Sequence, residues 1–112
     1  MKIGIIGQGF VGSAVYSKFK LFYDVFTFDV NPNLCNSNIE EIKKKCKIIF
    51  VCVPTPMNKD GSQDISIVED VIDNLIKNKV EALIILKSTV LPSSIEILQG
   101  KISRFIYNPE FL

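Results

Sequence analysis

Short apolar runs alternate along the chain with segments in which apolar side chains recur every three or four residues. The runs of strand length cover residues 2–6, 24–30, 46–53, 81–86 and 101–107. The segments of helical period cover residues 10–22, 37–45, 65–78 and 95–99. Strands that alternate with helices form right-handed crossovers and a parallel sheet covered on both faces. The pattern therefore predicts a single α/β domain, a Rossmann-type doubly wound parallel sheet of about five strands in the order 3-2-1-4-5.

Polar residues at the borders of these segments predict where helices begin and end. Ser37 stands three residues before Glu40, which is the spacing of a capping box, and Asp64 is a candidate N-cap of the third helix. Gly100 is expected to follow the last helix as its C-cap. The inward stripe of the third helix is expected to consist of Ile65, Val68, Ile72, Leu75 and Ile76.

The composition fits one small domain and excludes several classes of function. The chain has 112 residues, of which 47% are apolar, and its net charge is +1, so it can fill a core and carries no strong field of one sign. The short lysine cluster at residues 43–47 contains no aromatic side chain, which argues against nucleic-acid binding. Because histidine is absent, a general base or a metal site built on histidine is excluded, and no metal is expected.

The three cysteines, Cys35, Cys46 and Cys52, are expected to be free thiols. Their odd number and the lack of a CxxC spacing argue against a disulfide framework or a zinc site. Cys46 and Cys52 lie in an apolar run and are expected to pack in the core, and none has a neighbour that would activate it. Without a membrane-length apolar run or a signal-peptide pattern, the expected location is the cytoplasm.

Three glycines follow the first apolar run, in the sequence Gly7-Gln8-Gly9-Phe10-Val11-Gly12. This is a G-x-G-x-x-G between a predicted strand and a predicted helix, the context of a dinucleotide-binding loop. Gly7 is expected to turn the chain tightly, Gly9 to let a pyrophosphate approach the backbone, and Gly12 to let the helix pack closely on the strand. The free N–H groups and the dipole at the helix start would stabilise the diphosphate, so all six residues are candidate cofactor-binding residues.

Asp29 ends the second predicted strand, about 20 residues after the glycine motif, where a carboxylate accepts hydrogen bonds from the ribose next to the adenine. The following residues, Val30, Asn31 and Pro32, include no Arg or Lys to hold a 2′-phosphate, and the carboxylate would repel one. NAD is therefore favoured over NADP as the cofactor. The alternative is a structural glycine turn and an aspartate that only caps the strand end.

Distinctive residues gather in the loops that leave the predicted strands at their carboxyl ends. These loops read GQGFVG, DVNPN, PTPMNKDG, KSTVLPSS and NPEFL, whereas the return loops are short. In a parallel sheet the carboxyl ends share one edge, and open α/β sheets bind ligands at that edge.

The segments FVCVPTP, KSTVLPS and YNPEFL, in this order and together with the glycine motif and Asp29, resemble the N-terminal NAD-binding domain of the UDP-glucose and GDP-mannose dehydrogenases. The resemblance covers nearly the whole chain and is far more specific than the glycine motif alone. Members of this family oxidise the C6 alcohol of a nucleotide sugar to a carboxylate with two NAD. The resemblance thus implies an oxidoreductase of the nucleotide-sugar 6-dehydrogenase type.

The resemblance also implies further cofactor-binding residues. Val53, Pro54 and Thr55 would line the adenosine and ribose side of NAD through backbone contacts. Ser88 and Thr89 would lie beside the cofactor, with Thr89 near the nicotinamide. From the residues alone, the proline stays open as a residue that stiffens a loop, and the two hydroxyl residues as caps of a turn.

Two catalytic residues are implied in the same way. The hydroxyl of Thr89 would position a water or polarise an intermediate at the reacting carbon, and Glu110 would orient water for hydrolysis of the acyl intermediate. A solvated surface role for Glu110 stays open from the residues alone.

The sequence departs from the family in two respects. Only residues 31–45 connect the second strand to the FVCVPTP strand, where the family has another helix and strand, so the surface beside the adenine is trimmed. In the family the cysteine nucleophile, with its partner Lys and Asn, lies in later domains that bind the nucleotide sugar and form the dimer. Because this chain ends at Leu112, we expect those domains to be absent and the chain alone to be unable to complete turnover.

Three hypotheses for the function remain. The first is the NAD-binding domain of a nucleotide-sugar 6-dehydrogenase, the second a stand-alone, non-catalytic NAD-binding or regulatory module, and the third a scaffold that binds no nucleotide. The expected ligands are NAD and a nucleotide sugar at the sheet edge, with neither nucleic acid nor membrane as partner. The apolar last strand and the end Phe111-Leu112 also lead us to expect self-association.

Overall fold

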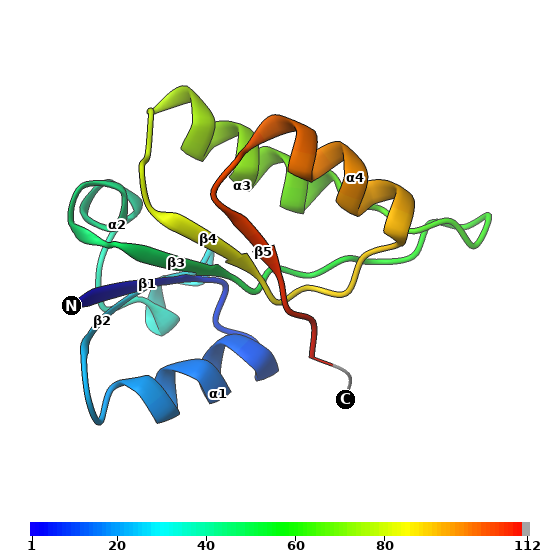
Figure 1. Ribbon diagram of the computed structural model, residues 1–112. Coiled ribbons are helices and arrows are strands. Elements are labelled where there is room, and N and C mark those ends of the chain that lie inside the picture. Colours follow the sequence, from blue (N-terminus) through cyan, green and yellow to red (C-terminus); the bar gives the residue numbers. More distant parts are fainter. Residues whose placement is uncertain (111–112) are drawn as a thin grey trace.

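Five parallel strands form one sheet in the computed structural model, which describes residues 1–110. The sheet has the spatial order β2-β1-β3-β4-β5, and every neighbouring pair is parallel (Figure 1). The strands are β1 (Lys2–Ile6), β2 (Asp24–Phe28), β3 (Ile48–Val51), β4 (Leu83–Leu86) and β5 (Phe105–Tyr107). The predicted Rossmann-type parallel α/β fold is therefore confirmed.

The predicted strand order, 3-2-1-4-5, is wrong. The third strand lies between β1 and β4, with Phe50 beside Ile5, and not beyond β2. The connection after β2 holds only a short 3₁₀ turn, η1 (Pro32–Leu34), and α2 (Ile39–Lys45), so the chain crosses back past β1 at once. The observed order is the other common doubly wound arrangement, whose ligand site lies between its first and third strands.

The free edge of β2 is covered by its own connection, residues 34–37. The amide of Thr27 donates to Oδ1 of Asn36 at 2.7 Å, and the amide of Asn36 donates back to the Thr27 hydroxyl at 2.9 Å. The amide of Ser37 donates to the Thr27 carbonyl at 3.2 Å. The backbone amide and carbonyl of Thr27 on this edge are thereby satisfied, which disfavours pairing with another chain there.

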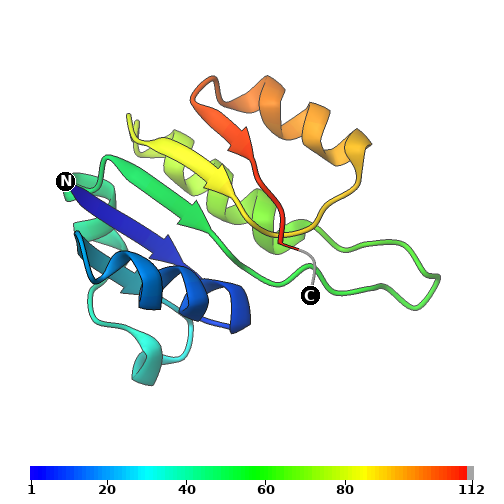
Figure 2. The same ribbon diagram turned by 60° about the horizontal axis from the view of Figure 1, so that its bottom comes forward.

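Helices cover the two faces of the sheet unequally. Within the described residues, α1 (Phe10–Phe19) lies on one face, and α2, α3 (Ser66–Lys77) and α4 (Pro92–Lys101) lie on the other (Figures 1 and 2). The smaller core, on the α1 face, includes Ile3, Ile5 and Phe50, and the ring of Phe19 stacks on Phe50 at 5.4 Å. The larger core forms under the other three helices.

The helix ends differ from the predicted ones by a few residues. Asn38, not Ser37, caps α2, because its Oδ1 accepts from the amide of Glu41 at 2.9 Å. The N-cap of α3 is Ile65 rather than Asp64, although Oδ1 of Asp64 still accepts from the amide of Ser66. These corrections are small since neighbouring polar residues offer equivalent capping groups.

The ends of the first and last helices were also predicted incorrectly. The first ends at Phe19 rather than at residue 22, and Gly100 lies inside α4 instead of following it as a C-cap. Of the predicted α3 stripe, Val68, Ile72 and Leu75 are buried, while Ile76 is 38% exposed. No helix within residues 1–110 is long and apolar enough to span a bilayer.

A long loop, residues 52–65, connects β3 to α3 and projects from the carboxyl edge of the sheet (Figure 2). Met57 and Gln63 form an antiparallel bridge within it, and the Asn58 amide donates to the Ser62 carbonyl at 2.7 Å. These contacts give the loop a hairpin shape, so its base is held in a defined position beside the end of β4.

Candidate functional site

A cleft of about 580 Å³ opens at the carboxyl edge of the sheet, where the loops after β1, β3 and β4 meet the segment after β5. Most of the candidate residues from the sequence line it: Gly7, Gly9, Phe10, Val11, Asp29, Val53, Pro54, Thr55, Ser88, Thr89 and Glu110. The lining also includes Val30, Cys52 and Lys87, which the sequence analysis did not select. Gln8 and Gly12 do not line the cleft but contact two residues that do, Asp29 and Gly7 respectively.

The three glycines of the motif meet three different surroundings. Gly7 has a φ of +98°, and a Cβ there would lie 2.6 Å from the carbonyl oxygen of Cys52. A Cβ on Gly12 would overlap the carbonyl oxygen of Gly7. A Cβ on Gly9 would meet no described atom within 4 Å. Gly7 and Gly12 therefore permit close packing inside the protein, whereas Gly9 keeps the floor of the cleft bare.

The N-terminus of α1 points its free amides at this bare floor. Gly9 is the N-cap and provides no side-chain cap, and the first turn contains no acidic residue. The amide of Ser13 donates to the Gly9 carbonyl at 2.9 Å, so the amides of Phe10 and Val11 come before the intrahelical ladder. Free amides and the positive end of the dipole are what an anion needs, and the site therefore fits the diphosphate of a dinucleotide.

Asp29 lies at the end of β2 and is hydrogen-bonded to the glycine loop. Its Oδ2 accepts from the amide of Gln8 at 2.7 Å, and its Oδ1 accepts from the amide of Asn31 at 2.8 Å. The thiol of Cys35 contacts the Asp29 amide and carbonyl, both at 3.1 Å. A carboxylate has about four acceptor positions, so Asp29 performs a structural role and keeps capacity for ribose hydroxyls.

Two exposed apolar side chains stand at the mouth of the cleft. Phe10 is 87% exposed and Val30 is 94% exposed. Such exposure is unfavourable for large apolar groups in water, and it places two apolar surfaces beside the candidate diphosphate and ribose positions.

The loop after β4 is fastened to the loop after β3 by side-chain hydrogen bonds. The hydroxyl of Ser88 donates to the Val53 carbonyl at 2.6 Å. The carbonyl of Thr89 accepts from the Thr55 hydroxyl at 3.1 Å and from the side-chain amide of Gln63 at 2.7 Å. Hence the VPTP and KSTV segments, far apart in sequence, form one wall of the cleft.

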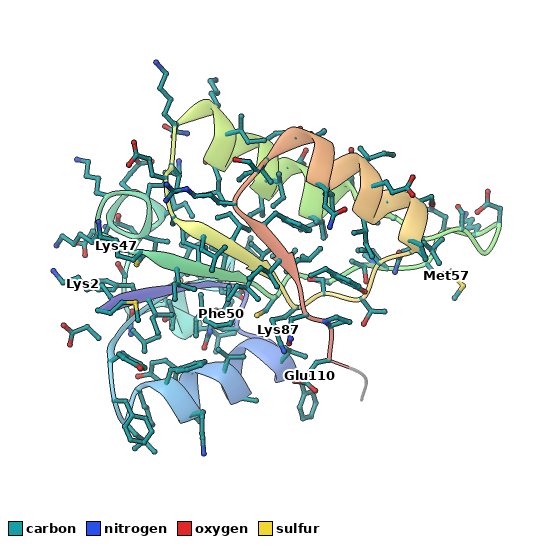
Figure 3. The ribbon with its side chains drawn as sticks, in the orientation of Figure 1. Lys2, Lys47, Phe50, Met57, Lys87 and Glu110 are labelled. Atoms are coloured by element: carbon teal, nitrogen blue, oxygen red, sulfur yellow. The ribbon has the colours of Figure 1, made fainter. Side chains whose placement is uncertain are left out.

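The two candidate catalytic residues lie together at the other end of this wall. The hydroxyl of Thr89 donates to the Glu110 carbonyl at 3.3 Å. One carboxylate oxygen of Glu110 lies 3.2 Å from Nζ of Lys87, which also donates to Oδ1 of Asn108 at 2.7 Å (Figure 3). Phe111 and Leu112, the end of the NPEFL motif and the apolar end expected to promote self-association, lie outside the described residues.

The buried cysteines Cys46 and Cys52 do not offer a nucleophile to the cleft. All three are free. Burial raises the pKa of the Cys52 thiol to about 12, although the nearby Lys87 lowers it in part. Burial likewise raises the pKa of Cys46 to about 11. Both are neutral thiols near pH 7, and a neutral thiol is a poor nucleophile.

No cluster of three or more potential metal-ligating side chains occurs in the part of the chain described, residues 1–110.

Sequence reasoning missed Lys87, Gln63, Val30 and Cys52 as parts of the site. Lys87 directly precedes Ser88 in the KSTV segment, so its position in a motif was an available signal. Val30 follows Asp29 immediately and could have been found in the same way. Gln63 had no such signal, because only the hairpin of the long loop brings it to Thr89.

Comparisons with known proteins show which family the chain resembles. Residues 31–112 match the family model of the UDP-glucose/GDP-mannose dehydrogenase family, NAD binding domain. The chain is 32% identical over 87 residues to YtcA of Bacillus subtilis (strain 168), whose name assigns it provisionally to the UDP-glucose 6-dehydrogenases. That match covers 69% of this chain and 20% of YtcA.

Solved structures share the fold. The UDP-D-ManNAc dehydrogenase of Pyrococcus horikoshii has a TM-score of 0.78 at 22% identity, covering 100% of this chain and 37% of the other. The GDP-mannose dehydrogenase of Pseudomonas aeruginosa has a TM-score of 0.78 at 23% identity, covering 100% and 36%. The chain thus spans little more than a third of the length of these dehydrogenases. It belongs to the UDP-glucose/GDP-mannose dehydrogenase family and corresponds to its NAD-binding domain, for which the cofactor is NAD.

Proposed function

We propose that this chain is the cofactor-binding part of a nucleotide-sugar 6-dehydrogenase, an enzyme that oxidises the C6 alcohol of a nucleotide sugar to a carboxylate with NAD. The observation that carries the proposal is the open space over Gly9 at the uncapped start of α1, with Asp29 fixed 2.7 Å from the neighbouring Gln8 amide. Membership of the family supports it.

The binding mode follows from the chemistry of the cleft. The diphosphate would lie over Gly9 and accept hydrogen bonds from the first-turn amides of Phe10 and Val11. Asp29 would accept from the ribose hydroxyls on the adenine side. The carboxylate disfavours a 2′-phosphate in the same place, which supports NAD over NADP.

The remaining lining residues extend this mode toward the nicotinamide. The backbone of Val53, Pro54 and Thr55 would line the adenosine and ribose side, and Ser88 and Thr89 the nicotinamide side. The position of all five in the lining of one cleft supports this assignment.

The catalytic proposal concerns Thr89 and Glu110. NAD, when bound, would take up the hydride from the alcohol carbon. Thr89 and Glu110 would hold water beside that carbon for the hydrolytic step, because a hydroxyl and a carboxylate can fix both the donor and the acceptor directions of one water. The Thr89 hydroxyl lies 3.3 Å from the backbone carbonyl oxygen of Glu110, and this proximity of the two residues supports the pairing. As the family resemblance implies, a cysteine nucleophile would come from a further domain, and the burial that keeps the Cys46 and Cys52 thiols neutral supports this.

Further proposals concern the surroundings of the domain. A nucleotide sugar would approach at the carboxyl edge of the sheet, and substrate-binding and dimerisation domains would complete the enzyme. Self-association of the isolated chain is supported by Ile106 of the edge strand β5, which is 46% exposed. The free cysteines support a reducing, cytoplasmic location.

Calorimetric titration of the purified chain with NAD and NADP, followed by addition of UDP-glucose and NADH absorbance measurements, tests the proposal. We expect NAD to bind, NADP to bind more weakly, and no NADH to form. Absence of NAD binding would leave only the scaffold hypothesis. NADH formation by the chain alone would show that later domains are dispensable. Binding without turnover also fits a stand-alone module, and determining whether the reading frame continues past codon 112 separates the two.

A further inference from the structure

Lys87 is a buried charged residue, with 8% of its surface exposed. It directly follows β4, where its amide donates to the Val51 carbonyl at 2.9 Å. Its side chain lines both the cleft and a second cavity of about 510 Å³ on the α1 face of the sheet, beside Phe50 and Ile106. Lys87 thus lies between the candidate NAD site and a second cavity of mixed polarity.

A buried ammonium is costly unless it has partners, and Lys87 has two. Nζ donates to Oδ1 of Asn108 at 2.7 Å and to a carboxylate oxygen of Glu110 at 3.2 Å. Two backbone bonds run alongside, from the Asn108 amide to the Leu86 carbonyl at 2.9 Å and from the Glu110 amide to the Lys87 carbonyl at 3.4 Å. The segment after β5 is therefore held on the end of β4 through Lys87.

The two partners of this ion pair differ in how far their side chains are exposed to solvent. The side chain of Glu110 is 54% exposed, whereas that of Lys87 is 9% exposed. The lysine is largely shielded from solvent, while the exposed glutamate would be free to rotate in solvent without it. We therefore infer that Lys87 orders Glu110. Through Glu110 it also orders Thr89, whose hydroxyl donates to the Glu110 carbonyl.

We propose that Lys87 is a positioning residue, which fixes the Glu110 carboxylate and, through residue 110, the Thr89 hydroxyl at the nicotinamide end of the cleft. The assignment of Glu110 and Thr89 to the nicotinamide end rests on the proposed function, whereas the contacts of Lys87 do not depend on it. Lys87 would act through these two residues and need not touch the substrate.

The test compares Lys87→Met with Lys101→Met. Methionine keeps the length and packing of the lysine chain and removes the charge. Lys101 is the control because, like Lys87, it has two side-chain oxygen partners, in this case the carboxylates of Glu69 and Asp73 at 3.7 and 3.1 Å, but on α3 and α4 away from the cleft. Lys87→Arg tests rescue by a conservative change, and Lys87→Gln replaces Lys87→Met if the latter does not fold.

The first readout is amide hydrogen exchange of the ligand-free chain. We expect exchange at Asn108 and Glu110 to become at least about 10-fold faster in Lys87→Met, to stay unchanged in Lys101→Met and to be restored largely by Lys87→Arg. Unchanged exchange at these positions, or faster exchange spread over the whole sheet, overturns the proposal.

The second readout is the ratio of the affinities for NAD and ADP-ribose, which lacks the nicotinamide. Lys87→Met is expected to weaken the binding of NAD about 3- to 10-fold and to leave the affinity for ADP-ribose unchanged. The reason is that one wall of the cleft at its nicotinamide end becomes less ordered. If the wild-type chain binds NAD and Lys87→Met has the same ratio of NAD to ADP-ribose affinity as the wild type, the proposal is overturned. If the wild type binds neither ligand, the proposed function fails, and the exchange measurement alone decides whether Lys87 orders Glu110.

Discussion

The amide of Gln8 donates a hydrogen bond of 2.7 Å to the carboxylate of Asp29, and this contact joins the glycine loop after β1 to the end of β2. The candidate ribose acceptor is thus also part of the structure that shapes the candidate diphosphate site. The two explanations of Asp29 considered from the sequence, ligand binding and capping, are compatible, because the carboxylate has acceptor positions left for both.

Replacing Asp29 with Ala is expected to weaken NAD binding by about 1–3 kcal/mol, since the ribose hydroxyls lose a charged acceptor. The change also leaves the Gln8 and Asn31 amides without their acceptor, so the melting temperature should fall. Calorimetry with NAD and thermal unfolding measure the two effects. Asp24→Ala, at the exposed start of the same strand, is the control. Wild-type affinity in Asp29→Ala would assign the carboxylate a structural role alone.

Gly9 and Gly12 are expected to respond differently to substitution. Gly9→Val should leave the unfolding free energy within about 1 kcal/mol of wild type, because the side chain enters open space. It should abolish measurable NAD binding, since the branched side chain fills the diphosphate position. Calorimetry and urea unfolding of the same sample check both points, and tight NAD binding by Gly9→Val would contradict the proposed mode.

Gly12→Ala is the matched change at the third glycine. Its Cβ would overlap the carbonyl oxygen of Gly7, so α1 must move away from the loop. We expect a loss of about 1–3 kcal/mol in the unfolding free energy, measured by urea denaturation. A variant as stable as the wild type would mean that the helix can shift without cost.

Gln63→Ala should loosen the wall that contains Thr89. The side-chain amide of Gln63 donates to the Thr89 carbonyl at 2.7 Å and accepts from the Leu91 amide at 3.3 Å. Loss of both bonds is expected to lower the unfolding free energy by about 1–2 kcal/mol. Ser62→Ala is the control, because its hydroxyl bonds only within the same loop. Equal stability of the two variants in urea would show that the Gln63 contacts are weak.

The stability should decrease in alkali through the buried thiols. The pKa of Cys52 is raised from 9.0 to about 12 and that of Cys46 to about 11, both by burial. Between pH 9 and these values the unfolded chain loses the thiol protons while the folded chain keeps them, so the unfolding free energy falls as pH rises. Urea unfolding at pH 8 to 11 measures this slope. Cys52→Ala should show a shallower slope than the wild type, and identical slopes would exclude Cys52 as its source.

Parts of the fold and the site could be predicted because they depend on local spacing. Gly7, Gly9 and Gly12 lie within six residues of one another, and Asp29 ends the next apolar run, so the strand and helix periods alone indicated where they would lie. The cap of α2 was misplaced by one residue, since Ser37 and Asn38 are neighbours with similar capping chemistry. Helix ends depend on such small differences.

The rest depends on tertiary contacts that no local pattern contains. The strand order required knowing on which side of β1 the chain would cross after β2, which apolar periodicity does not specify. The position of Lys87 in the KSTV segment was visible in the sequence, but its burial beside Asn108 and Glu110 was not, because lysine side chains are nearly always solvated. The contact of Gln63 with Thr89 likewise requires the whole hairpin of the long loop.

Residues 34–37 cover the free edge of β2, and this arrangement bears on how small a dinucleotide-binding domain can be. The cleft is lined by residues at or after the ends of β1, β3, β4 and β5, and on the β2 side by Asp29 and Val30 alone. A strand–helix pair outside β2 is therefore expendable, provided that a few residues such as Asn36 take over its pairing role. A smaller nucleotide-binding domain could therefore be designed by shortening the sheet at the β2 edge. The opposite side of the sheet, which carries Lys87 and Glu110, should be left unchanged.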